Sequence, residues 1–122
     1  MTSILNTVKK AIGPAVSEYE YFDSDLIMHI NTTFNVLKQL GVGPVEGFYI
    51  EDAESDWDEF IDPGPNSQMV QTYMCLAVRL KFDPPESSAH IQAIKDQIAE
   101  LEWRLNIDAE TPSLGGKRPS DL

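Results

Sequence analysis

Two adjacent prolines, Pro84 and Pro85, separate two helical segments in this chain. Proline has no amide hydrogen and disfavours helical backbone in the residue before it, so the preceding helix must end there. Ser87 or Ser88 can cap the next helix by accepting a hydrogen bond from the exposed amides of its first turn. That helix carries one narrow apolar seam with alternating three- and four-residue spacing, formed by Ile91, Ile94, Ile98, Leu101 and Leu105.

Trp103 lies on this helix but on the far side from the seam. If the helix packed only within a monomer, its largest side chain would be left in water. Tryptophan is favoured as an anchor of protein interfaces, and the neighbouring Glu102 and Arg104 can make polar contacts around it. The sequence therefore predicts a subunit interface at Trp103, Arg104 and Glu102.

Three other segments have the pattern of main helices. They are expected to begin after Thr2 or Ser3, at Asp23 or Ser24 and at about Asn66, and to end at Gly13-Pro14, at Gly41 and near Phe82. The helix that ends near Phe82 is apolar nearly all round, which in a small soluble protein is typical of a central helix. Between these segments, residues 45–53 are predicted to form an extended strand, a hairpin arm or an ordered loop. Ser55 followed by Asp58 predicts the cap of a short helix through Trp57.

The predicted fold class is therefore all-α: a small bundle of four main helices plus one short helix, with an extended loop or hairpin. Residues 1–106 are expected to form one helical domain. Residues 107–122 contain two prolines and two glycines without periodicity, so they are expected to form a flexible C-terminal tail. Leu114, Lys117 and Arg118 are the candidate binding residues of that tail.

Four motifs point to a known family. They are F-D-S-D-L at 22–26, L-G-V-G-P at 40–44, D-P-P-x-S-S at 83–88 and E-L-E-W-R-L-N at 100–106, and the last two are the most specific. With them the chain resembles, over roughly residues 3–106, the head–tail connector (adaptor) proteins of long-tailed bacteriophages. The resemblance implies a structural virion protein of the head–tail neck, assembled in the host cytoplasm.

The resemblance also implies partners. Such proteins assemble as rings, commonly dodecameric, under the portal and above a stopper or tail-terminator protein, and DNA passes through the ring. Family members use terminal extensions to clasp the portal or a neighbouring subunit, a use that the tail of this chain fits. A ring closes through contacts between two different surfaces of each subunit. The helix with Trp103 is expected to supply one surface, and the polar face of the helix that starts at Asp23, or the acidic segment described below, the other.

The formal net charge of −11 makes the chain a poor binder of phosphate backbones. DNA can still be a neighbour, because an acidic lumen repels phosphate and lets DNA slide without sequence-specific binding; solubility alone is the other interpretation. No apolar run approaches the roughly 20 residues that span a bilayer, and no secretory signal is present. The sequence thus predicts a cytoplasmic origin and no membrane partner.

Residues 51–62 contain seven acidic side chains and no basic one. A calcium loop is not expected, since Trp57 stands where such a loop needs glycine and Pro63 where it needs glutamate. Two interpretations stay open, a solvated face at the start of the short helix and a docking surface for a basic partner. The docking residues would be Glu51, Asp52, Glu54, Asp56, Asp58 and Glu59.

Nothing in the sequence predicts catalysis. His29 and His90 have no second ligand at metal spacing, and Cys75 lies among apolar residues that favour a buried, inert thiol. There is no nucleophile elbow and no phosphate-binding glycine loop. We therefore expect no enzyme activity, no metal and no cofactor.

Two alternative functions remain. A small acidic helical module that regulates a basic partner would explain the charge but leaves Trp103 and the D-P-P-x-S-S motif unexplained; salt-sensitive binding would favour it. A tail-completion or stopper protein of the same phage neck is the other, although such proteins usually contain more β structure.

Overall fold

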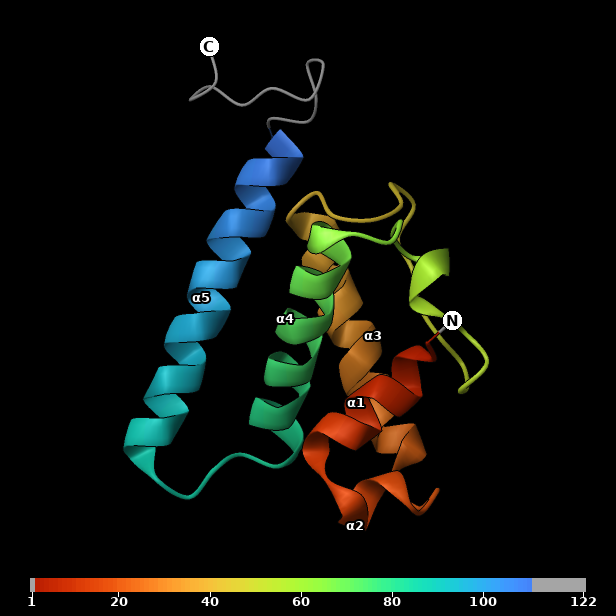
Figure 1. Ribbon diagram of the computed structural model, residues 1–122, viewed down its shortest axis with the longest axis vertical. Helices are drawn as coiled ribbons and strands as arrows, with labels where there is room; N and C mark the ends of the chain where they lie inside the picture. The colour runs from red at the N-terminus through yellow and green to blue at the C-terminus, as the bar shows by residue number, and fades with distance from the viewer. Residues whose placement is uncertain (1, 111–122) are drawn as a thin grey trace.

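The computed structural model describes residues 2–110, and this part of the chain is helical and contains no strand (Figure 1). Its elements are α1 (Ile4–Ile12), α2 (Pro14–Ser17), α3 (Asp23–Gln39), the 3-10 helix η1 (Trp57–Glu59), α4 (Pro65–Phe82) and α5 (Ser88–Glu110). The predicted all-α bundle of four main helices is confirmed. None of the helices within residues 2–110 has both the length and the apolar composition needed to cross a bilayer.

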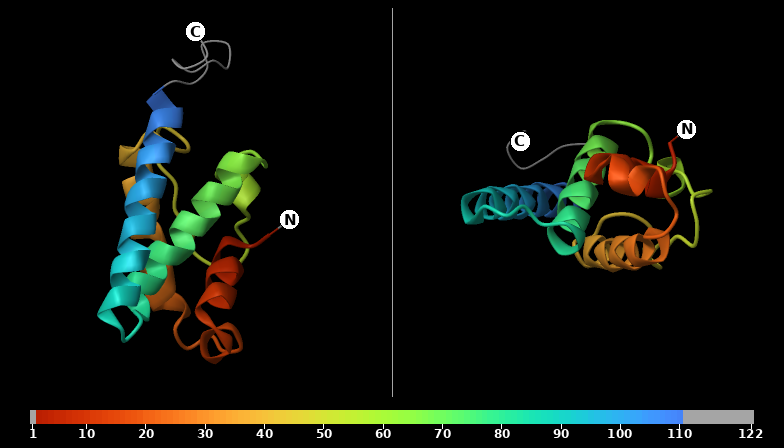
Figure 2. Two further views of the ribbon diagram at one scale, coloured as in Figure 1. Left: turned by 60° about the vertical axis from the view of Figure 1, so that its left-hand side comes forward. Right: turned by 90° about the horizontal axis from the view of Figure 1, so that it is seen from below.

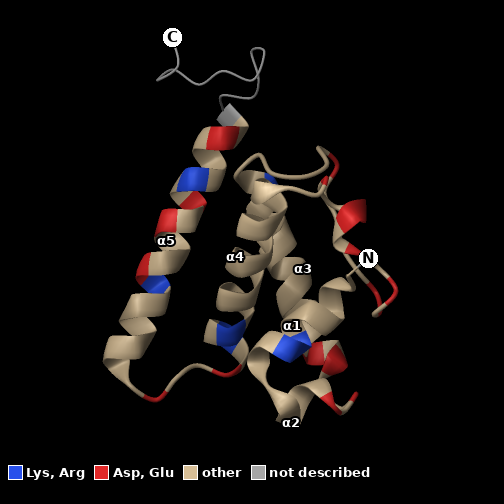
Figure 3. Cartoon of the chain, in the orientation of Figure 1, with Lys and Arg blue, Asp and Glu red and all other residues tan. Residues whose placement is uncertain are grey.

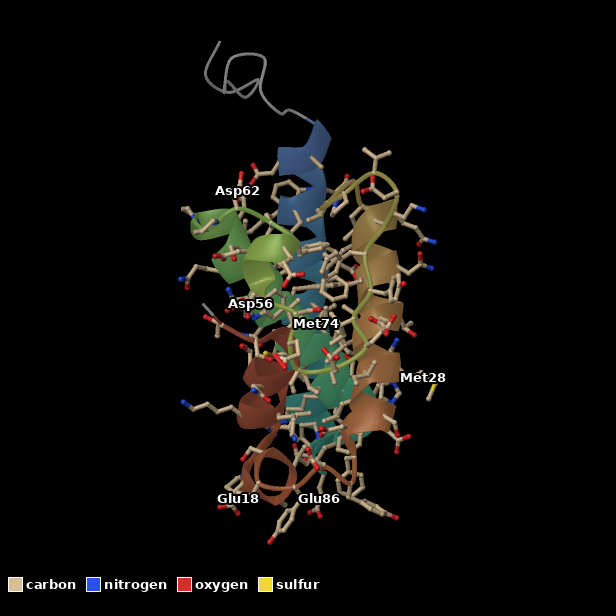
Figure 4. The ribbon with its side chains drawn as sticks, turned by 90° about the vertical axis from the view of Figure 1, so that its right-hand side faces the viewer. Glu18, Met28, Asp56, Asp62, Met74 and Glu86 are labelled. Atoms are coloured by element: carbon tan, nitrogen blue, oxygen red, sulfur yellow. The ribbon has the colours of Figure 1, made fainter. Side chains whose placement is uncertain are left out.

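Helix α4 is the centre of the bundle. It contacts α1, α3 and α5, and the views from two sides show these helices arranged around it (Figure 2). Val70, Tyr73, Met74 and Val78 of α4 are buried, and Met74 lies in the middle of the molecule (Figure 4). The prediction that the apolar helix before Pro84 is central is therefore confirmed.

Local sequence signals set most helix ends. Ser3 Oγ accepts a hydrogen bond from the Asn6 amide at 3.2 Å, and Ser87 Oγ accepts one from the His90 amide at 3.3 Å, so both caps are as predicted. Gly13 ends α1 as expected. Pro14 then begins the short helix α2, which was not predicted, because the fixed φ of proline suits the first position of a helix.

The cap predicted for the short helix was wrong by one residue. Asp56 is the N-cap of η1, and its amide donates to Glu59 Oε2 at 2.9 Å. Ser55 is engaged elsewhere, since its carbonyl accepts a hydrogen bond from the Ile4 amide at 2.9 Å. The backbone at Ser3 and Asp56 thus forms an isolated antiparallel bridge, which fixes the start of the chain beside η1.

Residues 45–53 form a loop rather than a hairpin. The Asn31 side chain of α3 binds this loop twice: Nδ2 donates to the Ile50 carbonyl at 3.0 Å, and Oδ1 accepts from the Ile50 amide at 2.8 Å. A side-chain amide therefore takes the place of a neighbouring strand. Phe48 packs edge-on against Phe34 of α3, with ring centroids 5.0 Å apart, so the loop closes one side of the core.

A buried cation connects α1 to the start of α3. Lys9 is only 6% exposed; its Nζ donates to the Tyr19 carbonyl at 2.8 Å and lies 2.7 Å from Asp23 Oδ1. A buried charge of this kind is tolerated only when it is paired and hydrogen-bonded. The segment between α2 and α3 is therefore held against α1 by Lys9.

Helix α5 continues to Glu110, past the boundary at 106 that the sequence suggested. The predicted tail residues Leu114, Lys117 and Arg118 lie outside the described residues. Their role, and the flexibility predicted for the tail, stay predictions.

Candidate interface surfaces

Helix α5 lies at one side of the bundle and presents an outer face that no other element within residues 2–110 covers (Figures 1 and 2). Its seam faces α4, where Ile94 and Leu105 are buried and Ile98 and Leu101 are partly buried against the core. Trp103 is 63% exposed. The predicted separation between the seam and this tryptophan is therefore confirmed, and its role at an interface stays a prediction.

The two charged neighbours of Trp103 have different surroundings. Glu102 Oε2 accepts a hydrogen bond from the Tyr73 hydroxyl of α4 at 2.8 Å, so it holds α5 to α4. Burial, together with this hydrogen bond, raises the pKa of Tyr73, so the phenol remains a donor at neutral pH. Arg104 Nε lies 3.3 Å from Glu100 Oε2, and both side chains are well exposed. Of the predicted trio, Trp103 and Arg104 are thus the more accessible to a partner.

We expect Tyr73→Phe to lower the free energy of unfolding by about 1 kcal/mol, because one hydrogen bond to a charged, partly buried acceptor is lost. Chemical denaturation at pH 7 measures this change.

The raised pKa of Tyr73 also means that the phenol stays protonated to a higher pH in the folded state than in the unfolded state. That stabilisation is present below about pH 10 and is lost as the pH rises further, so the variant should have a flatter alkaline profile. If the original protein and Tyr73→Phe lose stability equally as the pH rises above about 10, the hydrogen bond from Tyr73 to Glu102 is contradicted.

The six predicted docking acids lie together along the loop and η1, on the side of the molecule next to the N-terminus (Figure 3). Five of them are exposed, and Asp56 is partly buried by its place at the cap. An open groove of about 710 Å³ runs between this segment and the helices α1 and α3, and five of its lining residues are acidic: Glu20, Asp23, Glu51, Asp52 and Glu54. Binding of a basic partner here stays a prediction. Among the described residues, no group of histidine, cysteine and acidic side chains has the arrangement of a metal site.

Trp57 belongs to the interior, whereas Cys75 is half-buried. Trp57 is 1% exposed and its Nε1 donates to Thr7 Oγ1 at 3.1 Å, so it pins the short helix to the core. Burial raises the pKa of the Cys75 thiol to about 11, so little thiolate forms at neutral pH. The interpretation of Cys75 as an inert thiol therefore has a physical basis.

The polar face of α3, a candidate surface from the sequence, borders a groove that the sequence did not indicate. The groove, about 680 Å³, lies between α3 and the following loop; we call it the α3 groove and define it by Met28, Lys38, Glu46, Phe48 and Tyr49. Met28 and Tyr49 are 60% and 66% exposed, and Met28 projects outward from α3 (Figure 4). Methionine within an otherwise polar helix face was the signal that could have indicated it.

A family model described as "Phage connector protein" matches residues 4–112. Neither a curated protein nor a solved structure gives a significant match to the chain. The matched span includes every helix of the fold, from α1 to α5, and therefore both the outer face of α5 and the α3 groove. This chain belongs to the phage connector protein family and is a phage head–tail connector protein.

Proposed function

We propose that this protein forms a closed ring beneath the portal, joins the DNA-filled head to the tail and continues the DNA channel. A phage connector is a structural, non-enzymatic kind of protein, and the family implies a place in the virion neck. The observation that carries the step to a ring is the exposed Trp103 on the uncovered face of α5. A large aromatic side chain that the monomer leaves in water favours a contact between subunits.

A ring needs two different surfaces on each subunit, because only a head-to-tail contact repeats around a closed circle. The outer face of α5 and the surface of α3 meet this requirement. They belong to helices on different sides of α4, so one molecule can contact two neighbours at once (Figure 2). Trp103 and Arg104, with Glu102 behind them, would form one side of the contact.

The proposed partners follow from the place of such a ring. The portal lies above it and a stopper or tail-terminator protein below, with residues Leu114, Lys117 and Arg118 of the tail clasping the portal. The acidic segment with Glu51, Asp52, Glu54, Asp56, Asp58 and Glu59 would dock a basic surface of one of these neighbours. The net charge of −11 lets DNA slide through without being bound by sequence.

Light scattering of the purified protein, alone and mixed with the portal of its phage, tests this function. We expect a ring-sized mass, or co-migration with the portal, because the portal can template a ring from monomers. Trp103→Ala should weaken the assembly by about 30-fold or more in concentration, the usual effect of losing an aromatic anchor. Tyr19→Ala, which also removes an exposed aromatic side chain, is the matched control and should assemble normally.

If the protein stays monomeric and does not bind the portal under any condition, the proposed function is wrong. The alternative, an acidic helical module that regulates a basic partner, would then be favoured by the charge of the chain. It predicts binding to a basic protein that weakens steeply between low and high salt and does not depend on Trp103, whereas assembly of the connector requires Trp103.

A further inference from the structure

The α3 groove gathers exposed apolar side chains in one place. Of the large hydrophobic residues that are exposed in the described part of the chain, Met28 and Tyr49 line the groove and Val45 precedes it in the loop. Phe48 also lines the groove, and its ring packs on Phe34. Asn31, Thr32 and Asn35 of α3 add polar groups to the lining. An exposed hollow with large apolar and aromatic side chains is typical of a surface that receives a side chain from a partner.

The α3 groove carries no excess of negative charge, unlike the groove beside α1. Its charged lining residues are Lys38 and Glu46, one of each sign, and the aliphatic chain of Lys38 lies against Gly47, next to Glu46. The groove beside α1 is lined instead by five acidic residues. Because the whole chain carries −11, a second copy meets less repulsion at the α3 groove than at the acidic groove beside α1.

The outer face of α5 carries the complementary pattern. Trp103 is flanked by Glu100 and Arg104, again one charge of each sign, held 3.3 Å apart. Both signs follow each other along this part of α5 (Figure 3). A tryptophan beside two opposite charges thus matches a hollow whose lining contains apolar side chains and two opposite charges.

We propose that Trp103 of one copy inserts into the α3 groove of the next copy, where Arg104 faces Glu46 and Glu100 faces Lys38. The inference rests on the proposed ring and names its second surface. An indole side chain fits within about 680 Å³ and leaves room for Met28 and Tyr49 to close around it. Lys38 and Glu46 then exchange a solvated environment for partners of opposite sign at the rim, and Arg104 and Glu100 exchange their exposed contact with each other for these partners.

A charge-exchange experiment tests the contact. Sedimentation or light scattering gives the self-association constant, with the portal present if it is needed to start assembly. Glu46→Arg and Arg104→Glu should each weaken association by about tenfold, and the double variant should recover to within about threefold of the original. Glu86→Arg and Lys10→Glu change the net charge equally at exposed sites outside both surfaces and should have little effect. Lys38→Glu with Glu100→Lys is an independent second pair.

Tryptophan fluorescence provides a readout specific to insertion. Trp57 is already buried, so the quenching of fluorescence by acrylamide reports mainly on Trp103. Assembly should protect Trp103 from the quencher, and Met28→Asp in the groove should reduce assembly about as much as Trp103→Ala does.

The outcomes separate this contact from the ring itself. If either single charge reversal leaves ring formation unchanged, the proposed contact is wrong. It is also wrong if the double variant does not recover the association that the single variants lose. In both cases the proposed function still stands. Loss of portal binding by Met28→Asp without any change in ring mass would assign the groove to the portal and also overturn it. Absence of any ring, alone or with the portal, would overturn both.

Discussion

Replacing Trp57 with alanine is expected to lower the free energy of unfolding by about 3–5 kcal/mol, the usual cost of removing a buried aromatic side chain. Trp57 is 1% exposed, and its ring centroid lies 6.3 Å from that of Phe34 in the centre of the aromatic cluster. Its Nε1 also donates to Thr7 Oγ1 at 3.1 Å, so the indole connects η1 to α1. The substitution therefore leaves a cavity where two segments meet, and the Thr7 hydroxyl keeps only the hydrogen bond that it donates to the Ser3 carbonyl.

Trp103→Ala is the matched control, because it removes the same side chain from the surface. We expect it to change the free energy of unfolding of the monomer by no more than about 0.5 kcal/mol. Urea denaturation followed by circular dichroism measures both variants without depending on tryptophan fluorescence. Thr7→Val removes this hydrogen bond together with the one that the Thr7 hydroxyl donates to the Ser3 carbonyl, at a cost of about 1–2 kcal/mol. If Trp57→Ala were as stable as Trp103→Ala, the assignment of one tryptophan to the core and the other to the surface would be wrong.

The features that the sequence predicted well are governed by local rules. Pro84 ends α4 and Ser87 caps α5 because backbone geometry and hydrogen bonding within a few residues decide both. The spacing of the seam in α5 placed Ile94 and Leu105 in the interior for the same reason, since helical period fixes which face is apolar. An exposed Trp103 followed directly from that geometry.

The features that the sequence did not predict depend on contacts between distant residues. Asn31 binds Ile50 across nineteen positions, which turned a strand-like segment into a loop. Lys9 is buried although lysine is normally exposed, because Tyr19 and Asp23 fold back to meet it. Residue types alone do not show that Asn31 binds Ile50, or that Lys9 binds Tyr19 and Asp23.

The candidate interface residues also divide into those that local sequence patterns indicate and those that only the fold reveals. Trp103 and the acidic segment could be named from sequence, because one stands outside a helical pattern and the other is a run of like charges. The engagement of Glu102 by Tyr73 and the α3 groove required the fold, since each joins elements that are separate in the chain.

Gly43→Ala is expected to lower the free energy of unfolding by about 2–5 kcal/mol, through two separate causes. Gly43 has φ of +90°, a backbone conformation that costs a residue with a Cβ about 1–2 kcal/mol. A Cβ at this position would also lie 2.4 Å from Cε1 of Phe60. Phe60 has little freedom to move away, because its ring packs against Phe34 and Phe48 with centroids 4.6 and 5.3 Å away; such overpacking costs about 1–3 kcal/mol.

Gly47→Ala separates the two causes. Gly47 has a similar φ of +95°, but a Cβ there meets only the flexible side chain of Lys38, at 3.4 Å. We therefore expect this control to lose only the backbone term, about 1–2 kcal/mol in urea denaturation. The difference between the two variants measures how rigidly the aromatic cluster holds the turn after α3. Equal losses would mean that Phe60 moves away easily from the new methyl group. Phe48, which packs on Phe60 and lines the α3 groove, would then be less rigidly held than a side-chain pocket for a neighbouring subunit requires.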